Sequence, residues 1–362
     1  MTRLRTRRVI PDSIRNICVI PGLTREPCSR STWMLAFASM TSVAATLLFN
    51  PAAAQEWKPG KNVDIIVSSG AGGAADRQAR VIQRFVQQVP GVPSVTVSNR
   101  PGGGGTVAWT VLNQHRGDAH YIATMNVSLV TNQVLGLSSI RYQDLTPLNI
   151  LLREYIAVYT RSDSPITSTK ELIARLKKDP SSVSFGLSPA RGNQNHIVIG
   201  MIARAAGIDP KALKIVVYSS GGQGITAALG GHVDVWAGTV AGALPHAQSN
   251  AVRVLGVSAA QRQAGAAASF PTFREQGVDA VYYAFRGTIA PGGLTPAQIA
   301  FWDQAFAKIV KDEEWKKVAL ENVWVDDFRG AAEARKHLDT EFALLQKLLA
   351  DLGVTGKPEP AK

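Results

Sequence analysis

The chain has 362 residues, of which 45% are hydrophobic and 18% are charged, and its formal net charge is +12 at pH 7. This composition is that of a globular protein, and the length is roughly twice that of a single domain of ~150 residues, which predicts two lobes. The basic residues are scattered along the chain and are not interleaved with aromatic residues, which argues against a nucleic-acid partner.

Residues 1–54 have the pattern of a secretory signal peptide. An arginine-rich stretch precedes an uncharged run at 33–49, and small residues ending in Ala54 follow it. A membrane anchor is the alternative, but the apolar run is marginal in length and is diluted by serine and threonine. We expect cleavage near Ala54 and a periplasmic mature chain. Both cysteines, Cys18 and Cys28, would be removed, which excludes disulfides, thiolate catalysis and cysteine metal sites from the mature protein.

From residue 63 onward, short apolar runs alternate with segments of helical spacing. The predicted strands are residues 63–67, 95–97, 121–125, 156–160, 183–185, 215–218, 233–237, 252–257 and 282–290. The predicted helices are residues 76–89, 106–112, 168–177, one that begins at Thr295 and a final one through Leu352. Repeated strand–helix units of this size predict an α/β fold with mostly parallel sheets flanked by helices.

Four glycine-rich turns lead from a predicted strand into a predicted helix, at residues 68–75, 99–106, 188–195 and 219–224. Glycines let the backbone approach a ligand closely, and the free N–H groups of a helix N-terminus attract anions. One such turn is common in α/β proteins. Four of them, shared between two lobes, favour a small anion held between the lobes.

The first of these turns also matches the dinucleotide fingerprint G-x-G-x-x-G/A, over residues 70–75. The next strand ends in Ser98-Asn99-Arg100, however, and offers no acidic residue to bind a ribose hydroxyl. Export would also separate the chain from the nicotinamide pool. We therefore expect no nucleotide and no other cofactor.

Catalytic and metal motifs are absent from the sequence. The six histidines show no metal-ligand spacing, no nucleophile elbow is present, and no lysine follows the glycine-rich turns as in a P-loop. Two residues of the third turn remain open to two interpretations. His196 is either a capping or packing residue or a ligand contact, and Arg191 is either a solvated loop residue or a bidentate partner for a carboxylate.

A set of short motifs in a fixed order makes the chain resemble the solute receptors of tripartite tricarboxylate transporters, the Bug or TctC family. The resemblance extends over residues 57–353. Its markers are Trp57-Lys58-Pro59, Gly72-Gly73-Ala74-Ala75-Asp76, Asn99-Arg100-Pro101-Gly102-Gly103-Gly104, Asp144-Leu145-Thr146-Pro147, Asp163-Ser164-Pro165-Ile166, residues 192–196, residues 228–234, residues 271–277 and Ala290-Pro291.

The resemblance implies a type II periplasmic-binding-protein fold, with two lobes joined by a hinge. Lobe one would comprise residues 55–158 and 283–362, with the C-terminal helix docked on it, and lobe two residues 159–282. Ligand would lie in the cleft, with its carboxylates bound by backbone and side-chain groups of the loops. Carried over residue by residue, the expected ligand contacts are Ser69, Gly72, Gly73, Ala74, Asn126, Ser188, Gly192, Asn193, His196 and Thr239, with Arg191 as a further candidate.

Two loops depart from the family pattern. The first loop of the family is often rich in phenylalanine and proline, whereas this chain has Ser68-Ser69-Gly70-Ala71. The second loop, residues 187–191, also differs from the usual Ser-Ala-Gly type. Because both loops would surround the ligand, a familiar substrate such as citrate does not follow from the resemblance.

The expected function is capture of a small carboxylate, such as a di- or tricarboxylate or an aromatic acid, by hinge closure. The protein, expected to be a monomer and not an enzyme, would deliver this ligand to the membrane permease subunits of a tripartite tricarboxylate transporter. A periplasmic sensor that hands its closed form to a signalling receptor is the alternative. An exported hydrolase is a third hypothesis, which turnover of the bound ligand would reveal.

Overall fold

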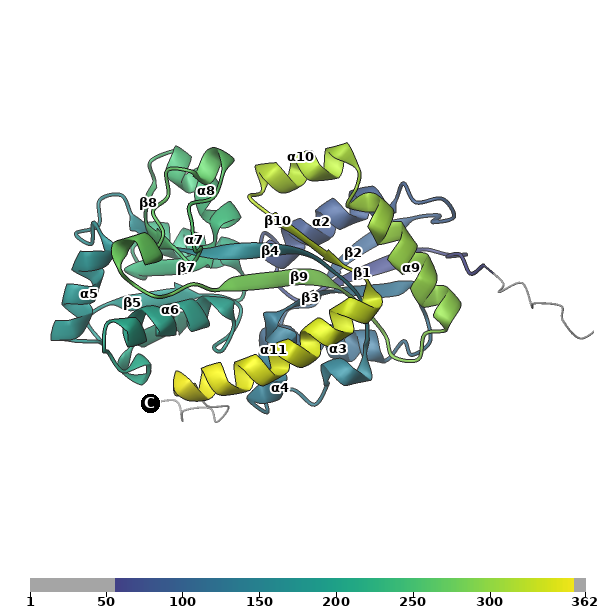
Figure 1. The fold of residues 1–362 in the computed structure, drawn as a ribbon, viewed down its shortest axis with the longest axis horizontal. Helices are drawn as coiled ribbons and strands as arrows, with labels where there is room; N and C mark the ends of the chain where they lie inside the picture. The colour runs from purple at the N-terminus through teal and green to yellow at the C-terminus, as the bar shows by residue number, and fades with distance from the viewer. Residues whose placement is uncertain (1–55, 355–362) are drawn as a thin grey trace, which may run out of the picture. The chain divides into compact units, whose positions relative to one another are not determined.

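The computed structural model describes residues 56–354, so the expected signal peptide lies outside the described residues. The described part is an α/β structure whose strands form one connected sheet path, β2-β1-β3-β9-β4-β7-β5-β6, with β10 and β8 paired to β4 (Figure 1). The predicted α/β fold is therefore confirmed. We call the strands around β1 sheet A and those around β7 sheet B; β4 contributes one half to each.

Sheet A is built first, from three parallel strands with a helix after each. Its elements are β1 (Val63–Val67), α2 (Ala74–Val86), β2 (Val95–Asn99), η1 (Gly103–Gly105), α3 (Thr106–Asn113), β3 (Tyr121–Asn126) and α4 (Val127–Val134). Side chains alternate across β1: Val63, Ile65 and Val67 pack with α2, and Ile66 packs with α3 on the other face. Burial on both faces explains why the strand is almost uniformly apolar.

Sheet B repeats this pattern with the middle of the chain. Its elements are α5 (Thr169–Lys178), β5 (Ser184–Leu187), α6 (Gln194–Ala205), η3 (Pro210–Ala212), β6 (Lys214–Val217), α7 (Gly221–Leu229), β7 (Val235–Thr239), α8 (Val240–Gln248) and β8 (Val252–Val257). Strand β5 pairs with β6 and with β7 in parallel. Val235 and Ala237 of β7 face the α6 side, whereas Trp236 faces α7 and α8.

Two long antiparallel strands connect the sheets. Strand β4 (Thr146–Arg161) pairs with β9 (Tyr283–Ala290) over residues 146–155, and with β7 and β8 from Ile156 onward. The chain thus changes from sheet A to sheet B within β4, close to the expected crossing, and returns through β9. The lobe boundaries at 158/159 and 282/283 stay a prediction, to which these pairings lend support.

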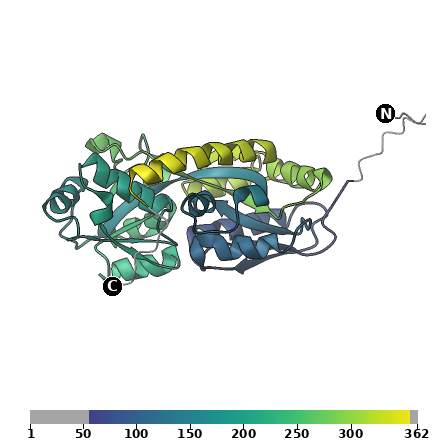
Figure 2. The same ribbon diagram turned by 90° about the horizontal axis from the view of Figure 1, so that it is seen from below.

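The C-terminal segment completes sheet A and reaches sheet B. Its elements are α9 (Pro296–Ile309), α10 (Glu313–Glu321), β10 (Val325–Arg329) and α11 (Ala331–Asp351). Helix α11 runs along both parts of the structure (Figure 2). Beyond its contacts with β4 and α4, its end meets α6, where Arg204 Nη1 donates to the carbonyl of Asp351 at 2.7 Å and Leu352 lies against Gly200.

One apolar core is shared by the two sheets. It joins Trp109 and Leu112 of α3 to Phe185 of β5, to α6 and to the leucines of α11. Separate clusters cover the outer face of each sheet, under α2 and α9 and under α7 and α8. Among the helices that the structure describes, none is long and apolar enough to cross a membrane.

Candidate ligand-binding site

A pocket of about 50 Å³ lies where the carboxyl ends of strands from both sheets converge. Ser69 follows β1, Asn126 ends β3, Ser188 follows β5 and Thr239 ends β7, and all four line the pocket and are buried. Ligands of open α/β sheets bind at the carboxyl ends of the strands, where loops are free to diverge. The convergence of these four polar residues therefore marks the candidate site.

Helix N-termini around the pocket differ in how they are capped. Asn126, Ser220 and Thr239 each accept a hydrogen bond from the backbone of the helix that they begin. Asn193 does the same for α6, accepting from the N–H groups of Asn195 and His196 at 3.0 Å. These N-termini are already satisfied by the protein's own side chains.

Helix α2 is different because its N-cap is Gly73, which has no side chain to act as a cap. The N–H groups of the first helical turn have no carbonyl partner within the helix, and two residues of this turn, Ala74 and Ala75, line the pocket. The positive end of the α2 dipole is thus directed at the cavity. Of the helix ends just compared, it is the one left open to an anion.

The loop before α2 is held rigidly by Asp76. Its carboxylate accepts from Gly72 N at 2.9 Å, from Arg80 Nε at 3.1 Å and from Asn99 Nδ2 at 3.0 Å. Burial alone would raise the pKa of Asp76, but these hydrogen bonds outweigh burial and lower it. Asn99 also donates to the carbonyl of Ser69 at 3.0 Å. The glycine-rich backbone is therefore fixed before any ligand arrives.

Two arginines line the pocket, and no aspartate or glutamate is among its lining residues. Arg286, in the middle of β9, has a side chain only 4% exposed, and its Nε donates to Glu154 Oε2 at 2.6 Å. Its two Nη nitrogens have no hydrogen-bond partner within residues 56–354. Arg77 of α2 donates from Nη2 to Thr239 Oγ1 at 3.3 Å and from Nη1 to the carbonyl of Gly72 at 3.1 Å.

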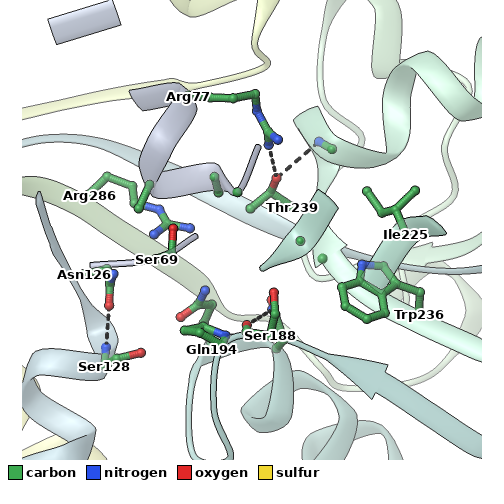
Figure 3. Close-up of a pocket in the computed structure, with 18 of the residues that line it drawn as sticks. Ser69, Arg77, Asn126, Ser128, Ser188, Gln194, Ile225, Trp236, Thr239 and Arg286 are labelled. Atoms are coloured by element: carbon green, nitrogen blue, oxygen red, sulfur yellow. Dashed lines mark hydrogen bonds between the residues drawn. The ribbon is translucent and has the colours of Figure 1, made fainter. Parts of the chain in front are cut away.

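Figure 3 shows how the two walls face each other, with Arg286, Ser69 and Asn126 on one side and Trp236 and Ile225 on the other. We call the first, built by Ser69, Ala74, Arg77, Asn126 and Arg286, the sheet A wall. The second is the sheet B wall, built by Tyr159, Ser188, Gln194, Trp236 and Thr239. Both arginines belong to the sheet A wall. The sheet B wall is uncharged.

The expected ligand contacts divide into two groups. Those that line the pocket are Ser69, Gly73, Ala74, Asn126, Ser188 and Thr239. Those that do not are Gly72, Arg191, Gly192, Asn193 and His196.

The residues of the second group form hydrogen bonds within the protein. His196 is buried and accepts from Gly192 N through Nδ1 at 2.9 Å. Burial, and then the nearby charge of Arg191, lower the pKa of His196 to about 4, so the ring is neutral at physiological pH. Asn193 caps α6 and donates to the carbonyl of Ser188. Arg191 is exposed and donates to the carbonyl of Ile215 at 3.3 Å, directed away from the cavity.

Several other residues that line the pocket were not predicted from the sequence. Among them are Arg77, Tyr159, Gln194, Asn195, Trp236 and Arg286. A signal existed for Arg286, since it is a lone charge inside the buried strand Tyr-Ala-Phe-Arg-Gly-Thr-Ile-Ala. Tyr159 and Trp236 carried no such signal, because an aromatic residue in a strand is ordinarily part of the core.

The comparison with known families decides the classification. The profile of the tripartite tricarboxylate transporter family receptors matches residues 78–349. The chain belongs to this family. The suspected resemblance is thereby confirmed, and the protein is a solute-binding receptor by family.

Curated relatives of this receptor include a UPF0065 protein from the gbd 5' region of Cupriavidus necator, 26% identical over 85% of this chain and 94% of the relative. Protein BugT of Bordetella pertussis is 28% identical over 66% of this chain and 73% of its own length.

Solved structures share the fold of the receptor. The periplasmic binding protein BugD matches with a TM-score of 0.75 at 21% identity, over 82% of this chain and 99% of that one. MatC of Rhodopseudomonas palustris, solved with bound malate, matches with a TM-score of 0.74 at 19% identity, over 80% and 99%. A second R. palustris protein, with adipate, matches with a TM-score of 0.76 at 20% identity, over 82% and 99%. The fold is thus that of a periplasmic binding protein of the TctC type.

Proposed function

We propose that this receptor captures a small carboxylate in the pocket between sheets A and B and hands it to the membrane permease subunits of a tripartite tricarboxylate transporter. The receptor acts as a periplasmic monomer, after removal of its signal peptide, and releases the ligand chemically unchanged. The observation that carries the proposal is the state of Arg286, which is buried in the pocket wall and has only one of its three nitrogens hydrogen-bonded to residues that the structure describes.

A guanidinium group has five N–H donors in a planar fork that fits a carboxylate bidentately. Glu154 fixes the orientation of Arg286 by binding Nε, and Trp324 Nε1 donates to the other oxygen of Glu154 at 3.0 Å. The Nη edge is thereby directed at the cavity without being free to rotate. A charged donor pair held in place in this way is the group that a carboxylate ligand requires.

The open N-terminus of α2 supports the same ligand chemistry. Ala74 and Ala75 offer backbone N–H groups to the cavity, and Ser69 and Asn126 add polar side chains beside them. We therefore propose Ser69, Gly73, Ala74 and Asn126 as contacts of the carboxylate, together with Arg286. Ser188 and Thr239 contact the ligand from the opposite wall. Gly72, Gly192, Asn193, His196 and Arg191 shape the two loops behind these contacts.

Contacts between loops of the two sheets support capture by closure. Arg77 of α2 donates to Thr239 at the end of β7, and Gly70 lies next to Ser220, at the start of α7. These contacts join the mouth of the cavity across the two walls. Opening them is the movement by which a ligand would enter and leave.

Isothermal titration of the mature receptor with succinate, malate, adipate, citrate and benzoate tests the proposal. At least one acid is expected to bind with a micromolar Kd. Arg286→Gln is expected to weaken this binding by at least ~30-fold, because it removes one partner of a buried charge pair. Recovery of the acid unchanged after prolonged incubation is expected, and its consumption would indicate an enzyme.

Arg286→Gln alone leaves Glu154 as a buried, unpaired carboxylate, which destabilises the fold. The double variant Glu154→Gln/Arg286→Gln removes both charges, leaves no buried carboxylate unpaired and so separates folding from binding. Arg191→Gln is the matched comparison, an arginine whose side chain points away from the cavity. If none of the acids binds the wild-type receptor, or if the double variant binds as well as the wild type, the proposed site is wrong.

A further inference from the structure

Two aromatic side chains with polar tips stand next to each other on the sheet B wall. Tyr159 of β4 and Trp236 of β7 are direct partners in the antiparallel ladder, so their side chains lie on the same face of the sheet. Both are only 1% exposed, and both line the pocket. Figure 3 shows Trp236 across the cavity from Arg286.

Neither polar tip has a hydrogen-bond partner in the described part of the chain. The hydroxyl of Tyr159 is fully buried and unsatisfied, and Trp236 Nε1, unlike the indole nitrogens of Trp109, Trp302 and Trp324, makes no hydrogen bond within residues 56–354. The two tips converge beside Gly238. A Cβ built there would lie 2.7 Å from Trp236 Nε1 and 3.6 Å from the Tyr159 oxygen.

The chemistry of this pair is that of two hydrogen-bond donors. An indole N–H only donates. Burial raises the pKa of Tyr159, the effect of Arg77 in the opposite direction being smaller, so the phenol keeps its proton throughout the physiological range. Buried polar groups are normally satisfied, and each unsatisfied donor carries a desolvation cost. A ligand that supplies an acceptor removes this cost, whereas a ligand without one leaves it in place.

The indole ring cannot rotate toward another hydrogen-bond partner, because it is packed closely against the backbone of neighbouring glycines. A Cβ on Gly186 would lie 2.6 Å from ring atom Cε3, and a Cβ on Gly224 would overlap the ring itself. Side chains at these positions would occupy the space that the indole fills. The slot therefore fixes the N–H direction by packing, whereas on the other wall a hydrogen bond to Glu154 fixes Arg286.

We propose that Tyr159 and Trp236 form the specificity-determining end of the pocket and select acids with a hydrogen-bond acceptor at their second end. The inference rests on the proposed function, in which Arg286 binds the first carboxylate. Acceptable second ends are a carboxylate, a carboxamide or a keto oxygen. An acid of the same length that ends in a methyl group cannot satisfy either donor and is discriminated against.

The test is a titration of wild-type receptor and Tyr159→Phe with two series of matched acids. One series is succinate, succinamate and butyrate; the other is adipate, adipamate and hexanoate. The wild type is expected to prefer the first two members of one series over its methyl-ended member. Tyr159→Phe keeps the shape of the ring and removes an unsatisfied buried hydroxyl, so folding should be preserved or improved.

Loss of the phenol is expected to weaken the dicarboxylate by at least ~10-fold and the monoamide by ~2- to 10-fold, because hydrogen bonds to charged acceptors are the stronger ones. The methyl-ended acid should bind both proteins equally. For Trp236, tryptophan-labelled receptor should show one indole N–H resonance that moves downfield with the dicarboxylate and is not moved by the methyl-ended acid.

The two proposals fail in different ways. If no acid binds the wild-type receptor, both are overturned. If acids bind but Tyr159→Phe weakens all three members of a series equally, or weakens none, the inference about the second end is wrong and the proposed function stands. The inference is also overturned if no indole resonance distinguishes the dicarboxylate from the methyl-ended acid.

Discussion

The two walls of the pocket are built on different physical principles. The sheet A wall carries the charge: Arg286 is oriented by a buried carboxylate, Arg77 reaches over from α2, and the α2 dipole is uncapped. The sheet B wall carries no charge and consists of aromatic and small polar side chains held by packing, with Trp236 confined among glycines. In the functions proposed above, the sheet A wall attracts the anionic ligand and the sheet B wall selects between acids.

The side chains of the two walls are also held in position by different interactions. A buried arginine without a counter-charge would be very costly, and Glu154 supplies that charge while leaving the Nη edge available. On the other wall, the indole keeps its position because the neighbouring backbone has no Cβ in its place. Substitutions should therefore act on sheet A through electrostatics and on sheet B through shape.

The largest expected effect comes from Gly224→Ala, which adds a methyl group to α7 where it would overlap the ring of Trp236. Overpacking of this kind costs ~3 kcal/mol, well above the gain of up to ~1 kcal/mol from the better helix former. We expect a fall of roughly 3–5 °C in Tm, measured by calorimetry, and loss of acid binding in titration.

Gly222→Ala is the matched control, on the same helix two residues earlier. A Cβ there would meet the carbonyl oxygen of Gly72 at 3.6 Å, an ordinary contact. This variant should be as stable as the wild type or slightly more stable. Equal Tm values for the Gly222→Ala and Gly224→Ala proteins would show that the indole has room to move and that the sheet B wall is not fixed by shape.

An intermediate effect is expected from Arg77→Met, which removes one of the two charges of the sheet A wall but keeps the length of the side chain. The loss of a charge at the rim should weaken dicarboxylate binding by about 10-fold at low salt. The difference from wild type should shrink as ionic strength rises, because screening already weakens the interaction with the intact arginine.

Arg84→Met is the comparison for this change. Arg84 is also on α2 but lies on the protein surface, where its Nη2 is 3.6 Å from Glu314. Its removal should leave the Kd unchanged at every salt concentration. If the Arg77→Met and Arg84→Met proteins bind equally well, the arginine at the rim closes the mouth of the pocket without contributing charge to recognition.

The polar ends of the sheet strands were accessible from the sequence, and the aromatic wall was not. Ser69, Asn126, Ser188 and Thr239 follow apolar runs that are recognisable as strands, and the carboxyl ends of parallel strands meet at one edge. Their convergence needs no knowledge of which strands are neighbours. Their place at the carboxyl edge of the sheets thus follows from recognising the strands.

Trp236 required more than that. Whether a strand residue faces the core or a cavity depends on which strand pairs with it, and Tyr159 lies far from Trp236 in the sequence. Arg191 shows the converse difficulty. An arginine within a glycine-rich turn looks available to a ligand, but its direction is set by a contact with the carbonyl of Ile215, which belongs to another strand.

The smallest expected effect concerns pH and tests whether the sheet B wall stays uncharged. Because burial holds the pKa of His196 at about 4, acidification from pH 8 to pH 6 should not add a positive charge behind Ser188. His196→Asn keeps an acceptor for Gly192 N. We expect its affinity for a dicarboxylate to follow the same pH dependence as that of the wild type. If the affinity rises on acidification in the wild type but not in His196→Asn, His196 gains its positive charge in this pH range and lies near the ligand.

The same histidine predicts how stability changes with pH. Its folded pKa lies below the unfolded value of ~6.5, so its contribution to stability is fully present above pH 6.5 and is lost as the pH falls toward 4. Burial also lowers the pKa of His337 to about 4, whereas it raises that of Glu341 to about 7. The contribution of Glu341 to the stability of the fold is therefore lost as the pH rises. The wild type therefore mixes opposing terms. The value of Tm at pH 8 minus Tm at pH 5 should be smaller in His196→Asn than in the wild type. It should be unchanged in His232→Asn, which alters an exposed histidine. Equal values in the two variants would place His196 in contact with solvent, and the sheet B wall would then be within reach of a charge.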